Sequence, residues 1–463
     1  MQNDTKRRAT SSAAKRSEER ITLQIERLDD ELRGTSYVGG KRYVAEGTLP
    51  GEEVRCKVEK TEGNVHVCSV EKICKRSERR ITAVCPYAEN CGGCALQMLP
   101  YAEQLAIKQA LVQRKLAPFG VKTEEVVPTE LAYRNKVHLV FGFADGKTQI
   151  GFFDSRTHKV TDIAACMLHQ PWLEKLISAL RAWQARYKNR VFIPYSGQGS
   201  LRFAVARSLK TEDRSGIMLT LVSTEEKLKG VDFLYAELKK SFDSVSLWQN
   251  VNAQKTNEVL AGEFRFLLGE KRLKGSLCGV RFSLSPDSFF QVNEKLAERI
   301  YQRVFAEIER VGADTVIDAY SGIGITSAMF ARQGKRVISI EIEPSAVEDE
   351  KRLLRENGLS HLVEPICGDV GKTLSVLRKS GRIAGKTAFF VDPPRAGLGR
   401  EAVFNIAAFG AETVIYLSCN PVTLADDLRI FEKQGYKTVT AVPYDLFGYT
   451  RHVETLCLLS KKD

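Results

Sequence analysis

The stretch 314–341, DTVIDAYSGIGITSAMFARQGKRVISIE, decides the fold class of this chain. Its apolar periodicity predicts a strand over 314–318, a glycine-bearing turn over 319–324, a helix over 325–332 and a second strand over 335–341. Units of this kind build parallel sheets in α/β folds, and their ligands bind at the carboxyl ends of the strands. We therefore expect an α/β domain with a Rossmann-like sheet.

The turn in this stretch suits a nucleoside ligand. Glu341 ends the second strand, 23 residues beyond Asp318, and a carboxylate there can accept hydrogen bonds from both hydroxyls of a ribose. The helix N-terminus after Gly322 and Gly324 suits a carboxylate or a phosphate. Ser327 stands where the dinucleotide fingerprint G-x-G-x-x-G/A has its third small residue. The pattern therefore favours S-adenosylmethionine over a nicotinamide dinucleotide.

Two more strand ends carry polar residues. The apolar runs 388–390 and 413–416 predict buried strands; Asp392 follows the first within VDPPR, and Cys419 follows the second within SCNP. A thiol at this edge of a sheet is placed for nucleophilic attack, although a lone cysteine more often packs as a small hydrophobe. Because two rigid, polar strand ends occur in one sheet, we interpret them as a built site.

Length and composition indicate several folded domains. The chain has 463 residues, of which 43% are hydrophobic and 27% charged, so we expect two to four domains. The net charge of +12 favours a polyanionic partner. No apolar run approaches the ~18 residues of a membrane span, and the N-terminus lacks a signal-peptide pattern. With eleven cysteines and no export signal, we expect a cytoplasmic protein whose thiols are reduced or bound to metal.

The texture of the chain divides it into four segments. Residues 1–20 are polar and basic and are predicted to be a disordered tail. Short alternating runs punctuated by glycine over 21–80 predict a small β-barrel of the oligonucleotide-binding type. Strands and helices mix in a central α+β domain over 81–280, with a helix over 101–116. Regular alternation follows over 281–463, and its last two strands are expected to pair antiparallel.

Three cysteines within ten residues indicate a metal site. Cys85, Cys91 and Cys94 follow the spacing C-x5-C-x2-C, and the glycine pair between the last two lets the backbone curl round an ion. A fourth ligand is needed, for which Cys166 is the nearest candidate. All-thiolate ligation suits zinc or an iron–sulfur cluster, and the spacing does not choose between them. The C-x3-C-x2-C pattern of radical S-adenosylmethionine enzymes is absent.

Glu454 lies in the last predicted strand, between Val453 and Leu456. A carboxylate in an apolar strand is costly unless it is paired or functional, although an outward-facing residue on an alternating strand is the common alternative. Cys419, Asp392 and Glu454 on a fold for S-adenosylmethionine indicate methylation of carbon 5 of uracil. A thiolate that adds to carbon 6 makes carbon 5 nucleophilic, and a base must later remove the carbon 5 proton.

Seven motifs carry a resemblance to a known family. They are LPGE (49–52), Cys85 with CGGC (91–94), YRNK (133–136), SFFQVN (288–293), VDPPR (391–395), SCNP (418–421) and HVE (452–454). With them the chain resembles the RNA 5-methyluridine methyltransferases, in particular the bacterial 23S rRNA uracil-C5 methyltransferases with a TRAM domain and an iron–sulfur cluster. The resemblance covers nearly everything from Ile21 to the C-terminus.

The resemblance implies roles for individual residues. It makes Cys419 the nucleophile and Glu454 the base. The implied contacts of S-adenosylmethionine are Gln291, Tyr320, Glu341 and Asp392. The implied ligands of a [4Fe–4S] cluster are Cys85, Cys91, Cys94 and Cys166. The implied partner is RNA, bound by a monomer through a TRAM barrel over 21–80 and an iron–sulfur and RNA-recognition domain over 81–280.

The same residues help to choose between alternative functions. An RNA-binding module without catalysis is disfavoured because Cys419 and Glu454 occur together. An RNA cytosine-C5 methyltransferase would carry its nucleophile in a Pro-Cys type motif, and a nicotinamide oxidoreductase is the most distant alternative. A tRNA uridine-C5 methyltransferase remains open, since the sequence does not say which uridine is methylated.

Overall fold

The computed structural model describes residues 19–154, 157, 159–211, 214–254, 258–381, 383 and 385–462. The chain forms two compact units. One unit is Met1–Thr82 with Ala95–Pro100, and the other is Ala83–Cys94 with Tyr101–Asp463. The tail predicted over 1–20 lies almost wholly outside the described residues, and the first strand already begins at Arg20.

The first unit is a six-stranded sheet. In spatial order its strands are β1 (Arg20–Gln24), β5 (Glu53–Glu62), β6 (Val65–Lys75), β4 (Lys41–Ala45), β3 (Gly34–Val38) and β2 (Arg27–Leu28). Neighbours pair antiparallel except β4 and β6, which are parallel. Alternate residues such as Leu23, Val54 and Cys56 form its core, as period-2 strands dictate. The N–H of Glu26 donates to the carbonyl of Thr35 (2.9 Å), which brings the segment after β1 against β3, as a barrel would require.

A seven-stranded sheet occupies the centre of the second unit. In spatial order its strands are β13 (Glu263–Gly269), β12 (Ser244–Val251), β11 (Ser215–Ser223), β10 (Leu201–Lys210), β7 (Lys136–Ala144), β8 (Lys147–Phe153) and β9 (Val160–Asp162). The helices α2 (Trp172–Tyr187) and α3 (Val231–Lys239) bury one face, where Val137 and Ala206 lie. Because side chains alternate along a strand, Lys136 and Arg207 belong to the opposite face.

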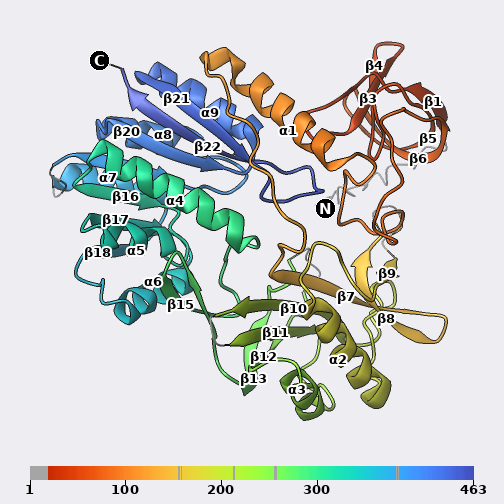
Figure 1. Cartoon of the computed structure of the whole chain (residues 1–463). Coiled ribbons are helices and arrows are strands. Elements are labelled where there is room, and N and C mark those ends of the chain that lie inside the picture. Colours follow the sequence, from red (N-terminus) through yellow and green to blue (C-terminus); the bar gives the residue numbers. More distant parts are fainter. Residues whose placement is uncertain are drawn as a thin grey trace, which may run out of the picture. The chain divides into compact units, whose positions relative to one another are not determined.

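A second seven-stranded sheet confirms the α/β fold expected for the C-terminal part (Figure 1). Its spatial order is β18 (Val363–Cys367), β17 (Arg336–Glu341), β16 (Thr315–Ala319), β19 (Thr387–Val391), β20 (Thr413–Ser418), β22 (Glu454–Lys461) and β21 (Tyr436–Tyr444). The first five strands are parallel, and β22 runs antiparallel to both of its neighbours. The strand order reverses between β16 and β19, which is where such sheets bind ligands.

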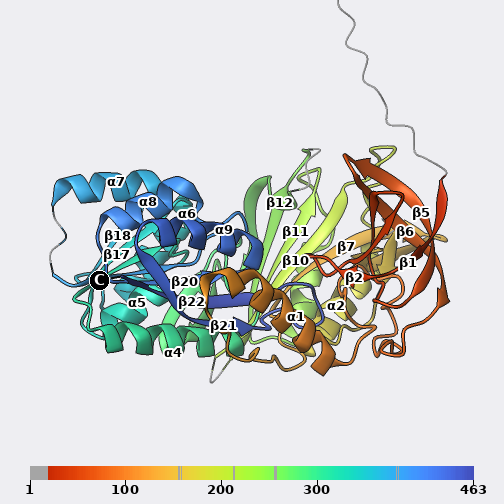
Figure 2. The same ribbon diagram turned by 90° about the horizontal axis from the view of Figure 1, so that it is seen from above.

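Helices cover both faces of this sheet. The helices α4 (Glu294–Val311), α5 (Ile325–Arg332) and α6 (Pro344–Glu356) share one hydrophobic core with the hairpin β14 (Leu273–Leu277) and β15 (Val280–Leu284). The helices α7 (Val370–Ser380), α8 (Gly399–Ala408) and α9 (Pro421–Lys433) share the other core. Figure 2 shows α7 and α8 on the face opposite α4.

The helix α1 (Tyr101–Leu116) packs on α9, and its Val112 and Leu116 belong to a core of the C-terminal seven-stranded sheet. A short 3-10 helix, η1 (Ala117–Phe119), follows it. Within the described ranges, no helix combines the length and the apolar character that crossing a membrane requires.

Candidate active site

Two candidate residues lie at the ends of adjacent parallel strands. β19 ends at Val391, so Asp392 is the next residue, and β20 ends one residue before Cys419. Val391 pairs with Tyr416 across these strands, so both turns lie at the carboxyl edge of the sheet. The turn after β20 is fixed by Asn420, whose side chain accepts the N–H of Val422 at the start of α9 (3.1 Å).

Glu454 reaches the same edge from the antiparallel strand. It is the first residue of β22, whose next residue, Thr455, pairs with Ser418 of β20. The Glu454 side chain is almost fully buried, and its Oε2 has no hydrogen-bond partner within the described part of the chain. A buried carboxylate oxygen without a partner is costly, which indicates a site completed by a ligand.

Burial raises the pKa of all three side chains, and neighbouring carboxylates add to the rise. Burial raises the pKa of the Cys419 thiol to about 12; Glu454 and Asp392 add to the rise and Arg395 opposes it. Burial also raises the pKa of Glu454 well above its usual value, and the charge of Asp392 adds to it. Burial, with the charge of Asp318, raises the pKa of Asp392 to about 7. A cation that binds nearby would favour the ionised forms of Cys419, Glu454 and Asp392 and so lower their pKa values.

Arg395 links the VDPPR and HVE motifs. Its Nη1 donates to Nδ1 of His452 (2.8 Å), while burial and then the charge of Arg395 lower the pKa of His452 to about 4. The backbone carbonyl of Arg395 accepts from Asn420 Nδ2 (3.2 Å) and Thr423 Oγ1 (3.1 Å). The sequence motifs contain Arg395 and His452, but no pattern in the sequence reveals that they pair.

The glycine-bearing turn is organised by carboxylates. Glu341 accepts the N–H groups of Gly322 (3.0 Å) and Ile342 (2.8 Å). Asp318 Oδ2 accepts from Thr326 Oγ1 (2.7 Å) and Ser327 Oγ (2.6 Å). Ser327 therefore holds the acid at the end of β16, which explains its place where a dinucleotide fingerprint would have glycine or alanine.

Tyr320 and Glu350 flank this turn. Tyr320 has φ of +67°, a left-handed conformation that is uncommon outside glycine and concentrates at functional sites. Glu350 of α6 is fully buried, and Ser321 Oγ donates to it (3.2 Å). A Cβ on Gly324 would lie 2.4 Å from Cγ of Glu350, so only glycine fits the turn. Burial raises the pKa of Glu350 to about 8.

The SFFQVN motif crosses from the central sheet to α4. The carbonyl of Gln291 accepts from Asn135 Nδ2 (3.0 Å), and Asn135 also donates to Glu294 Oε1 (2.7 Å). Phe290 is buried against Phe282, with ring centroids 4.8 Å apart. Phe289, by contrast, is 67% exposed.

The face of the central sheet opposite α2 and α3 carries buried and half-buried cations where it approaches this motif. Arg207 lies 5.4 Å from the ring centroid of Phe290 and donates to its carbonyl (3.4 Å). Burial lowers the pKa of Arg207 to about 10 and, together with the charge of Arg207, that of Lys136 to about 8. Buried cations of like sign are costly, and the charge of Glu294, which acts on Arg207, offsets part of this cost.

The four candidate cysteine ligands are only partly brought together. Burial raises the pKa of Cys166, and the charges of Cys91 and Cys85 add to the rise, so these three thiols are neighbours. The charge of Cys94 instead acts on Tyr133 and Tyr449. Over the described ranges, no group of three or more Cys, His, Asp or Glu side chains is arranged to hold a metal ion. The thiol chemistry fits a soft metal, and the arrangement of the side chains does not yet match a metal site.

Comparisons with known proteins agree with this geometry. The family model described as tRNA (uracil-5-)-methyltransferase matches residues 276–462. An uncharacterized RNA methyltransferase of Clostridium tetani is 34% identical over 445 residues, covering 95% of both chains. Another, from Listeria innocua, is 32% identical over 450 residues, covering 96% of this chain and 98% of the relative. The crystal structure of the Pyrococcus abyssi tRNA (uracil-54, C5)-methyltransferase with S-adenosyl-L-homocysteine has a TM-score of 0.76 at 26% identity, covering 95% of this chain and 99% of the other.

Fold, site and relatives together define a methyltransferase that uses S-adenosylmethionine. The chain belongs to the family of RNA uracil-C5 methyltransferases, as its motifs had indicated, and RNA is its substrate.

Proposed function

We propose that this enzyme methylates carbon 5 of a uridine in 23S rRNA through a covalent bond between Cys419 and carbon 6. The observation that carries the proposal is the convergence of Cys419, Glu454 and Asp392 at one edge of the sheet. The cysteine motif and the barrel-like first unit support the rRNA assignment, because the resembling rRNA enzymes carry both. We further propose that the protein acts as a monomer in the cytoplasm.

The proposed methyl transfer proceeds in three steps. The Cys419 thiol gives up its proton, and its sulfur bonds to carbon 6, which moves the electron pair of the 5,6 double bond to carbon 5. Carbon 5 then takes the methyl group, and S-adenosylhomocysteine leaves as a neutral thioether. The Glu454 carboxylate finally removes the carbon 5 proton, the double bond re-forms and the Cys419 thiolate leaves. The only net proton released comes from carbon 5, because the departing thiolate regains the proton it lost.

The methyl donor is proposed to bind at the switch point of the sheet, where a ribose can reach the Glu341 carboxylate and an adenine ring can reach Tyr320. Gln291 and Asp392 complete the proposed contacts. The cationic sulfonium also fits the electrostatics, since it would favour the ionised forms of Cys419 and Glu454, whose pKa values are raised in the free protein.

The target uridine must leave its stack for Cys419 to reach carbon 6, so we propose a flipped base in a loop or a remodelled helix. Phe289 is proposed to stack in the vacated space, because its ring is 67% exposed while that of Phe290 is buried. The first unit and the central domain are proposed to hold the flanking RNA, in keeping with the net charge of +12.

A [4Fe–4S] cluster is proposed to be held by Cys85, Cys91, Cys94 and Cys166. The proximity of Cys166 to Cys85 and Cys91, despite its distance along the chain, supports this ligand set. When bound, the cluster would supply a rigid cross-link between the cysteine loop and the segment that follows β9, and it takes no part in the chemical steps above.

The mechanism is tested by two variants with opposite outcomes. Glu454→Gln should accumulate a protein–RNA adduct that survives denaturing gels and already carries the methyl group, because only the release step needs the base. Cys419→Ala should yield neither adduct nor 5-methyluridine. Wild-type turnover by Glu454→Gln, or product from Cys419→Ala, would remove that residue from the mechanism.

A tRNA substrate is the second candidate, favoured by the likeness to the Pyrococcus abyssi tRNA enzyme. Mass spectrometry of digested 23S rRNA and tRNA from a deletion strain separates the two. Loss of 5-methyluridine from rRNA alone supports the proposal, and its loss from tRNA alone supports the alternative.

A further inference from the structure

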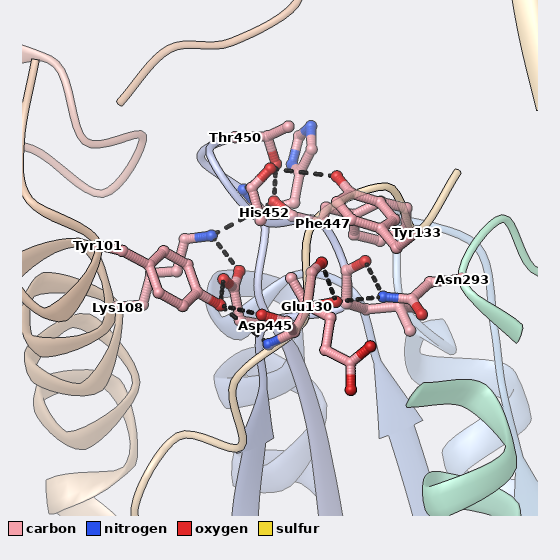
Figure 3. Close-up of polar contacts among 12 residues, drawn as sticks. Tyr101, Lys108, Glu130, Tyr133, Asn293, Asp445, Phe447, Thr450 and His452 are labelled. Atoms are coloured by element: carbon pink, nitrogen blue, oxygen red, sulfur yellow. Dashed lines mark hydrogen bonds and ion pairs between the residues drawn. The ribbon is translucent and has the colours of Figure 1, made fainter. Parts of the chain in front are cut away.

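A fully buried ion pair joins α1 to the loop that follows β21. Lys108 Nζ donates to Asp445 Oδ1, and both side chains are 0% exposed (Figure 3). The two residues are 337 positions apart in the chain. A buried ion pair seldom stabilises a fold, because desolvation of two charges offsets their attraction. A pair retained in such a place calls for a role other than stability.

The pair is the centre of a polar network. Tyr101 Oη donates to Asp445 Oδ2 (2.7 Å) and accepts the N–H of Thr129 (2.9 Å). Asn293 Nδ2 donates to Thr129 Oγ1 (2.7 Å) and to the carbonyl of Leu446 (3.1 Å). We call Lys108, Asp445, Tyr101, Thr129 and Asn293 the loop clasp. Figure 3 shows Tyr101 and Lys108 reaching Asp445 from α1, and Asn293 approaching the loop from the start of α4.

The clasped loop, 445–453, leads directly to the proposed base. It leaves β21 at Tyr444 and returns to the sheet at Glu454, the first residue of β22. Tyr133 Oη donates to the carbonyl of Gly448 (3.1 Å), and Tyr449 holds a left-handed φ of +66°. The path of the loop is therefore fixed largely by side chains outside it.

The clasp also touches the proposed donor segment. Asn293 is two residues beyond Gln291, and its side chain both caps α4, through the N–H of Leu296 (3.2 Å), and binds the loop at Leu446. One network thus contacts the segment that would hold the methyl donor and the loop that delivers the base. The loop joins Glu454 directly, at the point where the pairing of β22 with β21 ends with Tyr444 opposite Glu454.

We propose that Lys108 and Asp445 are positioning residues that fix the 445–453 loop and thereby aim Glu454 at carbon 5 of the target base. The inference rests on the proposed role of Glu454. It assigns to α1 a part in the release step, although α1 contributes no residue to the catalytic edge.

The test removes both charges together, since loss of one would strand the other in the interior. Lys108→Met/Asp445→Leu replaces the pair with apolar side chains, a change that is often neutral for stability. The matched control is Lys386→Met/Glu412→Gln, which removes an exposed ion pair (3.0 Å) that lies far along the chain from the loop. Each full-length protein is compared with wild type by amide hydrogen exchange and by the fraction of enzyme trapped as methylated RNA adduct.

The expected result is amide exchange over 445–453 at least about tenfold faster than in wild type, with unchanged exchange in β20 and an unchanged dissociation constant for S-adenosylmethionine. The trapped adduct should rise toward the level of Glu454→Gln, and the control should match wild type. Unchanged loop exchange, or fast exchange with wild-type adduct levels, overturns the positioning role. If Glu454→Gln itself traps no adduct, the base assignment fails, and loop exchange alone then decides whether the clasp fixes the loop.

Discussion

The strand-end site and the cysteine loop both gather reactive side chains from distant parts of the chain, and they do so in different ways. At the strand ends, Asp392 and Cys419 follow strands and Glu454 begins one, so the hydrogen-bond ladders place the backbone of these residues. In the cysteine loop, Cys91 forms an isolated bridge with Asp154, and its N–H donates to the carbonyl of Tyr87 (2.8 Å) within a turn. The first set is assembled by regular backbone, and the second lies on turns.

This difference would separate a site formed by the fold from one that the proposed cluster completes. Strand ladders set side-chain positions whether or not a ligand is present. Metal-binding loops take their geometry from the bonds to the metal, so thiols without a metal need not point at one centre. In the cysteine loop the charges of Cys85 and Cys91 act on Cys166, and no metal-holding group is formed among the described residues.

The largest expected effect concerns the cysteine loop. Anaerobically purified wild-type protein should contain iron and sulfide in near-equal amounts, and Cys166→Ser should lose both, since a [4Fe–4S] cluster needs all four of its thiolates. The matched control is Cys278→Ser, which changes a half-buried thiol in the turn between β14 and β15. Iron analysis and absorbance spectra measure the outcome. Colourless wild-type protein with stoichiometric zinc would show that the loop holds a different metal.

In the strand-end site, Cys419 should react with an alkylating reagent without any added metal. The rate should be proportional to the fraction of Cys419 that is present as thiolate. Its pKa is raised to about 12, so the rate of alkylation by iodoacetamide should rise about tenfold per pH unit from pH 7 to pH 10. Arg395→Gln should lower the rate at every pH, because the guanidinium favours the thiolate. Peptide mass spectrometry follows Cys419, with the exposed Cys74 as the reference thiol. A plateau below pH 9 would mean that the site already holds a thiolate.

The sequence predicts the regular elements of the structure, including the strands that form the strand-end site. Helices over 101–116 and 325–332 and the strands that end before Asp392 and Cys419 were predicted correctly, because periodicity and turn residues are local signals. The antiparallel pairing of the last two strands is also confirmed. The residue roles carried over from the family motifs stay predictions.

Contacts between distant segments have no local pattern in the sequence that would predict them. Nothing near Lys108 indicates that it pairs with Asp445, and the helix that carries it was assigned to the central domain, whereas it packs on α9. The sequence also could not distinguish Phe289 from Phe290, since adjacent aromatic residues look alike until packing buries one of them. Burial is a tertiary property, and the choice between these rings depends on Arg207 and Phe282.

Substitution of Phe289, whose ring is exposed, tests whether RNA contacts a side chain beside the strand-end site. Stacking of a base on an aromatic ring contributes roughly 1–3 kcal/mol, so Phe289→Ala should lower kcat/KM for RNA by about five- to 150-fold. Phe143→Ala, which removes another exposed ring from β7, is the control. Binding of S-adenosylmethionine should be unchanged in both variants. Wild-type kcat/KM in Phe289→Ala would exclude the ring from RNA binding.

The smallest expected effect is the loss of folding stability that the buried Glu350 causes when it must ionise. Burial raises the pKa of Glu350 from its ordinary value of 4.5 to about 8, so the folded state binds this proton more tightly than the unfolded state does. The resulting stability is fully present below about pH 4.5 and is lost as the pH rises toward 8. Glu350→Gln keeps the shape of the side chain and removes the titration. The variant should therefore match wild type at pH 5 and exceed it at pH 8 by on the order of 1–3 kcal/mol.

Chemical denaturation at the two pH values measures this difference, and Glu348→Gln, an exposed carboxylate on the same helix, serves as the control. Equal gains at pH 5 and pH 8 would point to packing rather than charge. A gain confined to pH 8 would show that the turn around Gly324 tolerates a buried acid at neutral pH at the expense of stability. A comparable penalty is not expected in the cysteine loop, because its thiols lie on turns that a metal would organise only when it binds.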